Sequence, residues 1–283
     1  MTVVKTINEV RKVIKDARLK GMTIGFVPTM GFLHEGHLSL MREAKTQTDY
    51  VVVSIFVNPT QFGPTEDLAT YPRDLARDQT LCESVGVDLI FAPEVEEMYP
   101  SGYSTIVDCE GPITKQLCGA SRPTHFKGVT SVVAKLFNIT LPDKAFFGQK
   151  DAQQVAVIEK MVKELNFDVE IVPCPIVREE DGLAMSSRNT YLDAEARRQA
   201  LVLSQSLNAA KASIDAGETR VSELIALIRE TIQQAPMAEI DYVQIVDART
   251  LLAIDELNDD TLIALAVKFG KTRLIDNLRI RRR

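Results

Sequence analysis

The stretch Thr23-Ile-Gly-Phe-Val-Pro28-Thr-Met-Gly31-Phe-Leu-His34-Glu-Gly-His37 decides how the first part of this chain is interpreted. A mostly apolar, strand-like run is followed by a helical pattern that begins near the two histidines. The whole chain has three histidines, and two of them stand here, three residues apart. A helix N-terminus carries unpaired N–H groups and a positive dipole, so it attracts anions. The pair therefore indicates a triphosphate site, with capping or packing as the alternative.

The first 175 residues repeat this alternation of strands and helices. A helix is expected over 6–20, with a Thr6/Glu9 capping box and a stop at Gly21. The strand-like runs are continuously apolar, as buried parallel strands are. These runs are Thr23–Val27, Tyr50–Val57, Val87–Phe91, Lys144–Phe147 and Asp168–Val172. The pattern predicts an α/β fold with a Rossmann-like, doubly wound parallel sheet.

The pattern changes after Pro173-Cys-Pro175. Helices are expected over about 194–215 and 220–234, followed by strands near 240–247, 261–268 and 273–280. A run of helices followed by strands favours a smaller α+β domain. We therefore predict two domains, 1–175 and 176–283. The closing Ile280-Arg-Arg-Arg283 is expected to be a solvated tail.

Composition limits the classes of function. The chain has 283 residues, 45% of them hydrophobic and 25% charged, and a net charge of −6, which argues against a nucleic-acid coat. No apolar run is long enough for a membrane span, and the N-terminus lacks a signal-peptide layout. The four cysteines show no zinc spacing, so reduced thiols are favoured over disulfides. We expect a cytoplasmic protein with no membrane or nucleic-acid partner.

Two further clusters also fall at strand–helix or loop positions suited to anions. Ligands of open α/β sheets bind outside the carboxyl ends of the strands. In Gly148-Gln-Lys150-Asp151, the lysine can place a point charge on a phosphate, although such a segment is often only a turn. In Met185-Ser-Ser-Arg188, hydroxyls beside an arginine suit a mobile anion-binding loop, with a polar linker as the alternative.

A P-loop is the motif alternative for the turn that carries the histidine pair. The glycine spacing of Gly31 and Gly36 imitates a P-loop, but His37-Leu38 stands where Lys-Ser/Thr is required, so we reject a P-loop.

Gln61 follows the second strand of the predicted sheet, and its amide can donate and accept at once, which suits a neutral hydroxyl. His125 alone is more typical of a structural histidine.

The histidine pair and the later Ser-Ser-Arg loop resemble the HIGH and KMSKS signatures of the nucleotidyltransferase superfamily. The resemblance is closer to one family, the pantoate–β-alanine ligases. It rests on five motifs in order: PTMGFLHEGHLSL, VVVSIFVNPTQFGPTEDLATYPR, GASRPTHFKGVTSVVAKLFN, FFGQKDAQQ and DGLAMSSRN. These cover most of residues 20–190, and a weaker similarity continues to Asp241-Tyr-Val and Arg273-Leu-Ile-Asp-Asn277. Modest departures from the family pattern are Gln149, Ala152 and Thr124.

The resemblance implies a ligase that condenses pantoate with β-alanine, using ATP and Mg²⁺, through a pantoyl adenylate that later releases AMP. It implies a homodimer, with ATP and pantoate bound by the first domain and the Ser-Ser-Arg loop carried by the second. His37 matches the family's proton donor, and Gln61 and Gln154 match its pantoate-binding glutamines. The implied ATP-binding residues are Met30, Gly31, Phe32, Leu33, His34, Glu35, Gly36, His37, Gly148, Gln149, Lys150, Asp151, Val177, Met185, Ser186, Ser187 and Arg188.

The residue types suit this chemistry. Negative charge develops on the α-phosphate and on the leaving pyrophosphate, and fixed donors aimed there stabilise the transition state. The candidate catalytic donors are His34, His37, Lys150, Ser186, Ser187 and Arg188. The metal ligand is unknown, with Asp78 a weak candidate. Two other hypotheses stay open: a nucleotidyltransferase with a phosphorylated acceptor, and a non-catalytic nucleotide sensor.

Overall fold

The computed structural model describes residues 1–282, which form two compact units. The ranges of unit 1 are Met1–Cys109, Thr124–Gln149 and Val157–Pro175. Unit 2 comprises Glu110–Pro123, Lys150–Ala156 and the chain from Ile176 to its described end. Two short segments of the first 175 residues, one on each side of Thr124–Gln149, thus cluster with the later part of the chain.

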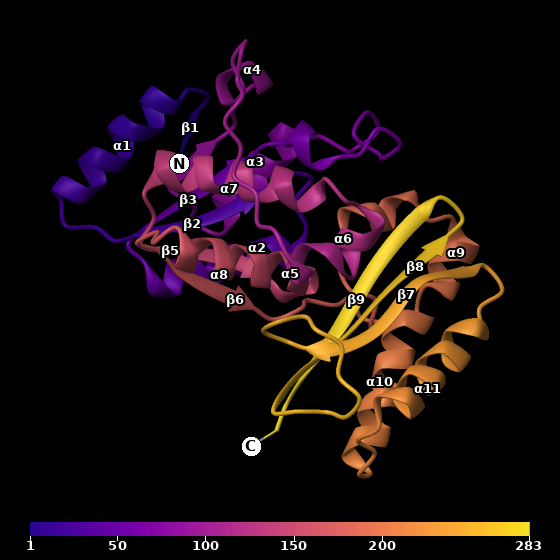
Figure 1. Cartoon of the computed structure of the whole chain (residues 1–283). Helices are drawn as coiled ribbons and strands as arrows, with labels where there is room; N and C mark the ends of the chain where they lie inside the picture. The colour runs from indigo at the N-terminus through magenta and orange to yellow at the C-terminus, as the bar shows by residue number, and fades with distance from the viewer. Residues whose placement is uncertain (283) are drawn as a thin grey trace. The chain divides into compact units, whose positions relative to one another are not determined.

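Unit 1 is built on a parallel sheet in the strand order β1-β4-β3-β2-β5-β6 (Figure 1). All of its pairings are parallel. The strands are β1 (Thr2–Val4), β2 (Ile24–Thr29), β3 (Tyr50–Ile55), β4 (Leu89–Phe91), β5 (Lys144–Gly148) and β6 (Glu170–Cys174). This sheet confirms the predicted fold class for the first part of the chain.

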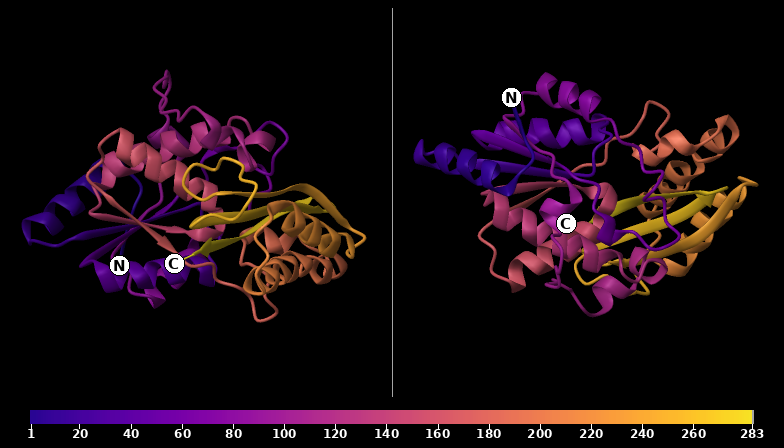
Figure 2. Two further views of the ribbon diagram at one scale, coloured as in Figure 1. Left: turned by 60° about the horizontal axis from the view of Figure 1, so that its bottom comes forward. Right: turned by 90° about the horizontal axis from the view of Figure 1, so that it is seen from above.

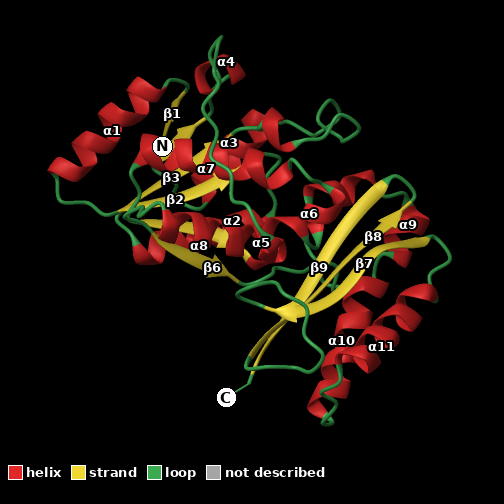
Figure 3. Cartoon of the chain, viewed as in Figure 1, coloured by secondary structure: helices red, strands yellow, loops and turns green. Residues whose placement is uncertain are grey.

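Helices lie on both faces of this sheet, as Figure 3 shows in red. Val27 of β2 packs in a core cluster with Leu38 and Met41 of α2, whereas the adjacent Phe26 meets Phe137 of α7 edge to face. Successive strand residues point to opposite faces, so β2 is covered on both sides. The helices along this part of the chain are α1 (Ile7–Leu19), α2 (Glu35–Gln47), α3 (Leu75–Ser84), α4 (Val95–Met98), α7 (His125–Thr140) and α8 (Ala152–Glu164), with 3₁₀ turns η1 (Pro59–Gln61) and η2 (Gln149–Asp151). Within η2 and α8, the residues Lys150–Ala156 belong to unit 2.

The predicted elements of this part are confirmed. All five predicted strands are present, with ends that agree with the prediction to within two residues. Helix α1 starts after Thr6, whose side chain accepts from the Glu9 N–H while the Glu9 carboxylate accepts from the Thr6 N–H. Strand β1 was not predicted, because three residues at a sheet edge carry too short a pattern to read.

Unit 2 contains an antiparallel sheet in the order β7-β8-β9, with helices α10 and α11 against one face (Figure 2). Its strands are β7 (Ala238–Asp247), β8 (Asp260–Phe269) and β9 (Thr272–Arg281). Its helices are α5 (Pro112–Lys115), α6 (Cys118–Ser121), α9 (Ala194–Gln199), α10 (Val202–Asp215) and α11 (Val221–Gln233), with the 3₁₀ turn η3 (Ser187–Tyr191). The predicted α+β character is confirmed.

Two details of the second part differ from expectation. The helix expected over 194–215 is divided into α9 and α10, because the Leu201 N–H turns back to the Arg198 carbonyl, three residues earlier. Ile280 and Arg281 are not a tail, since they pair with β8 as the end of β9, although the Arg281 side chain is exposed as expected. Arg283 lies outside the described residues.

The four cysteines are buried free thiols, as the sequence favoured. Among residues 1–282, no helix is both long enough and apolar enough to span a membrane.

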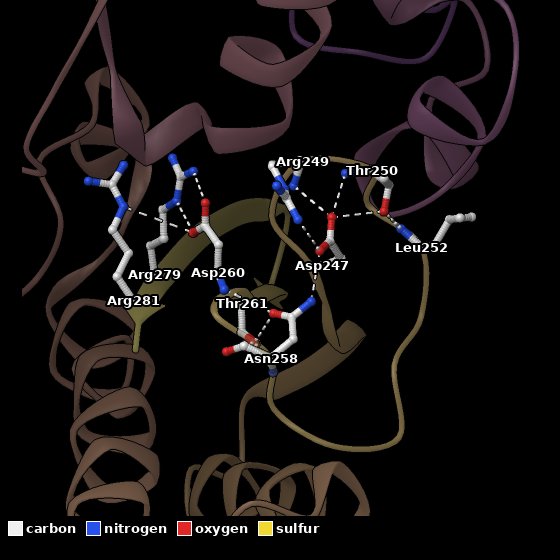
Figure 4. A network of polar contacts seen from close by, with 9 residues as sticks. All are labelled: Asp247, Arg249, Thr250, Leu252, Asn258, Asp260, Thr261, Arg279 and Arg281. Carbon is white, nitrogen blue, oxygen red and sulfur yellow. Dashed lines mark hydrogen bonds and ion pairs between the residues drawn. The ribbon is translucent and has the colours of Figure 1, made fainter. Parts of the chain in front are cut away.

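A polar network at one end of the unit 2 sheet fixes the connection between β7 and β8 (Figure 4). Asp247 accepts hydrogen bonds from Thr250 and from the Asn258 amide. Asp260 accepts from Nε and one terminal nitrogen of Arg279, at 2.7 and 2.6 Å. Such two-point pairs fix the relative orientation of both groups.

We expect Asp260→Asn to lower stability by about 1.5–3 kcal/mol at pH 7, because it weakens a charge-assisted pair. The Arg279 hydrogen bonds hold the pKa of Asp260 below its ordinary value. The stabilisation is therefore present above the unfolded pKa of about 4 and is lost as the pH falls through the lower folded value. Thermal melts should show the difference between wild type and variant closing between pH 6 and pH 2. A difference that does not change with pH would contradict this assignment.

Candidate active site

The carboxyl ends of β2, β3 and β5 meet at one edge of the unit 1 sheet. Strand β2 lies between β3 and β5, and the later strands extend outward from it in both directions. This is a topological switch point, where open α/β sheets bind their ligands. The structure thus brings together three of the predicted segments, which are Met30–His37 after β2, Gln61 after β3, and Gly148 with Gln149 at the end of β5.

The two histidines cap helix α2. His34 is the N-cap residue, and its Nδ1 accepts from the Gly36 N–H at 3.1 Å. His37 Nδ1 accepts from the His34 N–H at 3.2 Å, and the ring centroids lie 4.0 Å apart. A neutral imidazole that accepts at one nitrogen carries its proton on the other. In this tautomer both rings carry Nε2–H as a donor group, so the same side chains can cap the helix and bind an anion.

The turn before α2 is held by Asp78 from α3. The Asp78 carboxylate accepts from the Phe32 and Leu33 N–H groups at 2.8 and 2.7 Å, and the residue is 1% exposed. Gly31 and Phe32 both have positive φ, of 81° and 49°, a conformation that is strained for a phenylalanine. The carboxylate thus stabilises a strained turn that leads directly into the histidine pair.

The structure does not support Asp78 as a metal ligand. Both oxygens already accept backbone hydrogen bonds, and no group of three or more His, Cys, Asp or Glu in residues 1–282 could hold a metal. Burial raises the pKa of Asp78, against the lowering effect of the Leu33 and Phe32 N–H groups and of Arg77.

Arg77 also stabilises the turn before α2, since it donates to the Leu33 carbonyl at 2.9 Å and covers the Phe32 ring.

Gln61 is buried at the end of η1, among partners that the sequence did not reveal. Its Oε1 accepts from the Asn58 amide at 3.1 Å, and its Nε2 lies 3.2 Å from the Met30 sulfur. Asn58 is itself 1% exposed and accepts from the Tyr99 hydroxyl at 2.8 Å. Asn58 therefore orients the glutamine, and Gln61 in turn contacts the segment that carries the histidines.

Helix α7 packs against the 3₁₀ turn η1, which ends at Gln61. Nδ1 of the buried His125 lies 2.9 Å from the Gln61 carbonyl, and the Gly128 carbonyl accepts from the Asn58 amide. These contacts agree with a structural histidine. A side chain on Gly128 would place its Cβ 2.4 Å from the Thr60 carbonyl oxygen, so glycine is required for this close approach.

We expect Gly128→Ala to destabilise the protein by about 1–3 kcal/mol, because the new methyl group overlaps backbone atoms of η1 that have no rotamer to relax into. Gly63→Ala is the matched control, since its Cβ would meet only the Glu66 side chain, at 3.5 Å. Thermal melts of the two variants should separate clearly. Equal melting temperatures would show that η1 does not pack tightly on α7.

In unit 2, the lysine candidate lies in η2, where the Lys150 carbonyl accepts from the Asn277 amide at 2.9 Å. Asp151 is exposed, next to the start of α8. Gln153 is buried and bonds the segment before α6, accepting from the Cys118 N–H and donating to the Ile113 and Gln116 carbonyls. Gln154, the predicted pantoate ligand, is half-buried one residue further along α8.

The Ser-Ser-Arg segment follows a short hairpin. The Met185 N–H donates to the Val177 carbonyl at 3.0 Å, which places Val177 beside Met185. Ser186 is the N-cap of η3, and its Oγ accepts from the Arg188 N–H at 3.3 Å, so its hydroxyl hydrogen remains a donor. Ser187 is buried and Arg188 is half-buried.

This hairpin depends on residues that sequence reasoning missed. Arg197 joins Glu179 and Asp181 at 2.6 and 2.8 Å, and the Asn189 amide donates to Glu179 at 2.7 Å. Asp78, Glu179 and Arg197 lie outside the quoted motifs, whereas Asn58 and Asp181 lie inside them but were given no role. A weak signal was present for one of them, since Asn189 closes the quoted Ser-Ser-Arg-Asn motif.

The parallel sheet, its switch point and the histidine pair at the start of α2 define an α/β protein with a candidate anion-binding site and a small α+β unit. The family model described as pantoate-beta-alanine ligase matches residues 2–279. Two pantothenate synthetases, from Acetivibrio thermocellus and Pelotomaculum thermopropionicum, are 59% and 60% identical over 278 and 277 residues, covering 98% of this chain and 99% and 98% of those proteins.

Solved structures of the same family are similar to this chain over nearly its whole length. The pantothenate synthetase of Thermus thermophilus superposes with a TM-score of 0.94 at 47% identity, covering 98% of this chain and 99% of that one. A Francisella tularensis pantoate-beta-alanine ligase, solved as a complex with β,γ-ATP and β-alanine, has a TM-score of 0.82 at 37% identity, with 98% and 97% covered. The chain belongs to the pantoate–β-alanine ligase family, a family of amide-forming ligases.

Proposed function

We propose that this chain joins pantoate to β-alanine at the expense of ATP, through a pantoyl adenylate. Family membership supports the overall reaction, and the observation that supports the chemistry is the double capping of α2. Because both Nδ1 atoms accept backbone hydrogen bonds, both Nε2–H groups are preset as donors at the switch point. Donors fixed before the reaction cost no reorganisation when charge develops.

In the first step, a carboxylate oxygen of pantoate attacks the α-phosphorus of ATP, and the bond to pyrophosphate breaks. His34 and His37 donate to phosphate oxygens, with His37 as the proton donor, and Lys150, Ser186, Ser187 and Arg188 supply further donors. The ATP-binding set proposed from the sequence, Met30–His37, Gly148–Asp151, Val177 and Met185–Arg188, is kept here. Gly36 N–H is already used by His34, so the imidazoles rather than that amide meet the anion.

In the second step, the amine of β-alanine attacks the acyl carbon, loses a proton, and expels AMP. Gln61 and Gln154 bind pantoate, and Gln61 also borders β-alanine. The burial of Gln61 and its hydrogen bond from Asn58 support a fixed orientation of its amide. A mixed anhydride reacts readily with an amine that is held nearby, so positioning and exclusion of water carry this step.

The remaining assignments are proposals as well. Residues 1–175 form the domain that binds ATP and pantoate, and residues 176–283 form the domain that carries the Ser-Ser-Arg loop. The protein is a cytoplasmic homodimer. Mg²⁺ accompanies ATP and would be held mainly by the substrate phosphates, as Mg²⁺ often is.

The test is ATP–pyrophosphate exchange by the purified protein. Exchange is expected with pantoate and without β-alanine, and addition of β-alanine should release AMP in equal amount to the amide formed. Release of ADP would contradict an adenylate. A stable dinucleotide-like product that forms whether or not β-alanine is present would favour another nucleotidyltransferase. ATP binding with no turnover would favour a sensor.

A further inference from the structure

Two adjacent residues of β9, Asp276 and Asn277, contact the two loops of unit 2 that carry candidate phosphate ligands. Asp276 lies on the strand face that also carries Leu274 and Leu278, which pack against the unit 2 core. Asn277 points to the opposite face, because successive strand residues alternate. One loop is therefore held on each side of the same strand.

Asp276 holds the hairpin that leads into Met185–Arg188. Its buried carboxylate accepts from both terminal nitrogens of Arg178, at 2.6 and 2.9 Å. One of these nitrogens also donates to the Gly182 carbonyl at the hairpin turn, at 3.0 Å. A bidentate pair fixes the plane of the guanidinium as well as its distance. The hairpin is thereby fixed to β9 through its first arm, at Arg178, and the same guanidinium also holds its turn at Gly182.

Asn277 holds the other loop. Its side chain is 6% exposed, and its Nδ2 donates to the Lys150 carbonyl at 2.9 Å. Lys150 is the central residue of η2, so this hydrogen bond fixes the backbone from which the ammonium group extends.

Strand β9 is regular where it carries Asp276 and Asn277. Strand β9 pairs with β8 along its whole length, from Thr272 opposite Phe269 to Arg281 opposite Asp260. The two contacts are separated by one residue, a rise of roughly 3.3 Å. The Asp276 carboxylate is buried and the Arg178 side chain is 32% exposed. Because desolvation of the carboxylate offsets much of the attraction, the main effect of this pair is on geometry.

We propose that Asp276 and Asn277 are positioning residues that set Lys150 relative to Ser186, Ser187 and Arg188, so that both loops address one ATP phosphate chain. This inference rests on the proposed function. Neither residue touches the nucleotide, and each acts through the loop that it holds.

The experiment compares Asp276→Asn and Asn277→Ala with wild type in pantoate-dependent ATP–pyrophosphate exchange. Both variants should raise the KM for ATP at least tenfold and leave the KM for pantoate within about twofold, since small misplacements of donors are costly. Asp260→Asn is the matched control, because it weakens another arginine–carboxylate pair that involves β9, the one between Arg279 and Asp260. The control should keep the wild-type KM for ATP despite its lower melting temperature.

A double-mutant cycle tests whether the two residues share one purpose. Either substitution alone already frees one loop relative to the other, so the double variant should cost clearly less in kcat/KM for ATP than the product of the single effects. Multiplicative effects, or a KM for ATP in folded Asn277→Ala equal to that of the control, would overturn the inference. If Asp276→Asn does not fold, Asn277→Ala decides alone. Absence of exchange in wild type would instead contradict the proposed function.

Discussion

Replacing His37 by alanine should lower the rate of pantoate-dependent ATP–pyrophosphate exchange by about 10²–10³-fold, as the loss of one preorganised donor does in other enzymes. The imidazole presents Nε2–H because its Nδ1 accepts from the His34 N–H. Alanine removes the donor and also leaves that N–H without its cap, so a loss of stability of about 1 kcal/mol should accompany the kinetic effect.

His37→Gln separates the two roles. Glutamine is a preferred residue at the third position of a capping box, where its oxygen accepts from the N-cap N–H. We therefore expect this variant to recover the melting temperature but not the exchange rate, because its amide is turned back toward His34. Recovery of both would show that His37 acts only as a helix cap.

Asp78→Asn should be the second most damaging change. The asparagine can offer one oxygen where the carboxylate accepts from two backbone N–H groups, and its amide hydrogens would face the other donor. A buried donor left unsatisfied costs about 1–3 kcal/mol. The strained turn at Gly31 and Phe32 would relax, and a shift of about 1 Å in the histidines can cost about 100-fold in rate.

Asp74→Asn is the control for this change. Asp74 is the exposed N-cap of the same helix α3 and accepts from the Arg77 N–H. Asparagine is as good an N-cap as aspartate, so this variant should keep both stability and exchange rate. The measurements are thermal melts and exchange kinetics on both variants. If Asp78→Asn matches Asp74→Asn in rate, the turn does not depend on the buried carboxylate.

Much of the fold could be predicted because it depends on local patterns of the sequence. Continuous apolar runs identify buried parallel strands, and the Thr6/Glu9 box marks the start of α1. Strand β1 was missed and the strand predicted near 273–280 ends one residue short of β9, for opposite reasons. The first is too short to show a period, and the arginines of the second resemble a solvated tail although Ile280 and Arg281 continue the ladder with β8.

The candidate ligands could be predicted for a similar reason, since His34, His37, Lys150 and Arg188 stand in compact motifs. Their supports could not. Asp78 lies more than forty residues from the turn that it holds, and Asp276 nearly a hundred residues from Arg178. Nothing in the local sequence distinguishes such a carboxylate from a surface one, and only the folded contacts assign it.

The most direct test of the account follows the oxygen atoms of pantoate. Pantoate labelled with ¹⁸O in its carboxylate should be converted with ATP and β-alanine, and the products analysed by mass spectrometry. If the carboxylate attacks the α-phosphorus, one labelled oxygen appears in AMP and one remains in the amide product. AMP without label, or label in inorganic phosphate, would contradict the pantoyl adenylate on which the proposed roles of His34 and His37 depend.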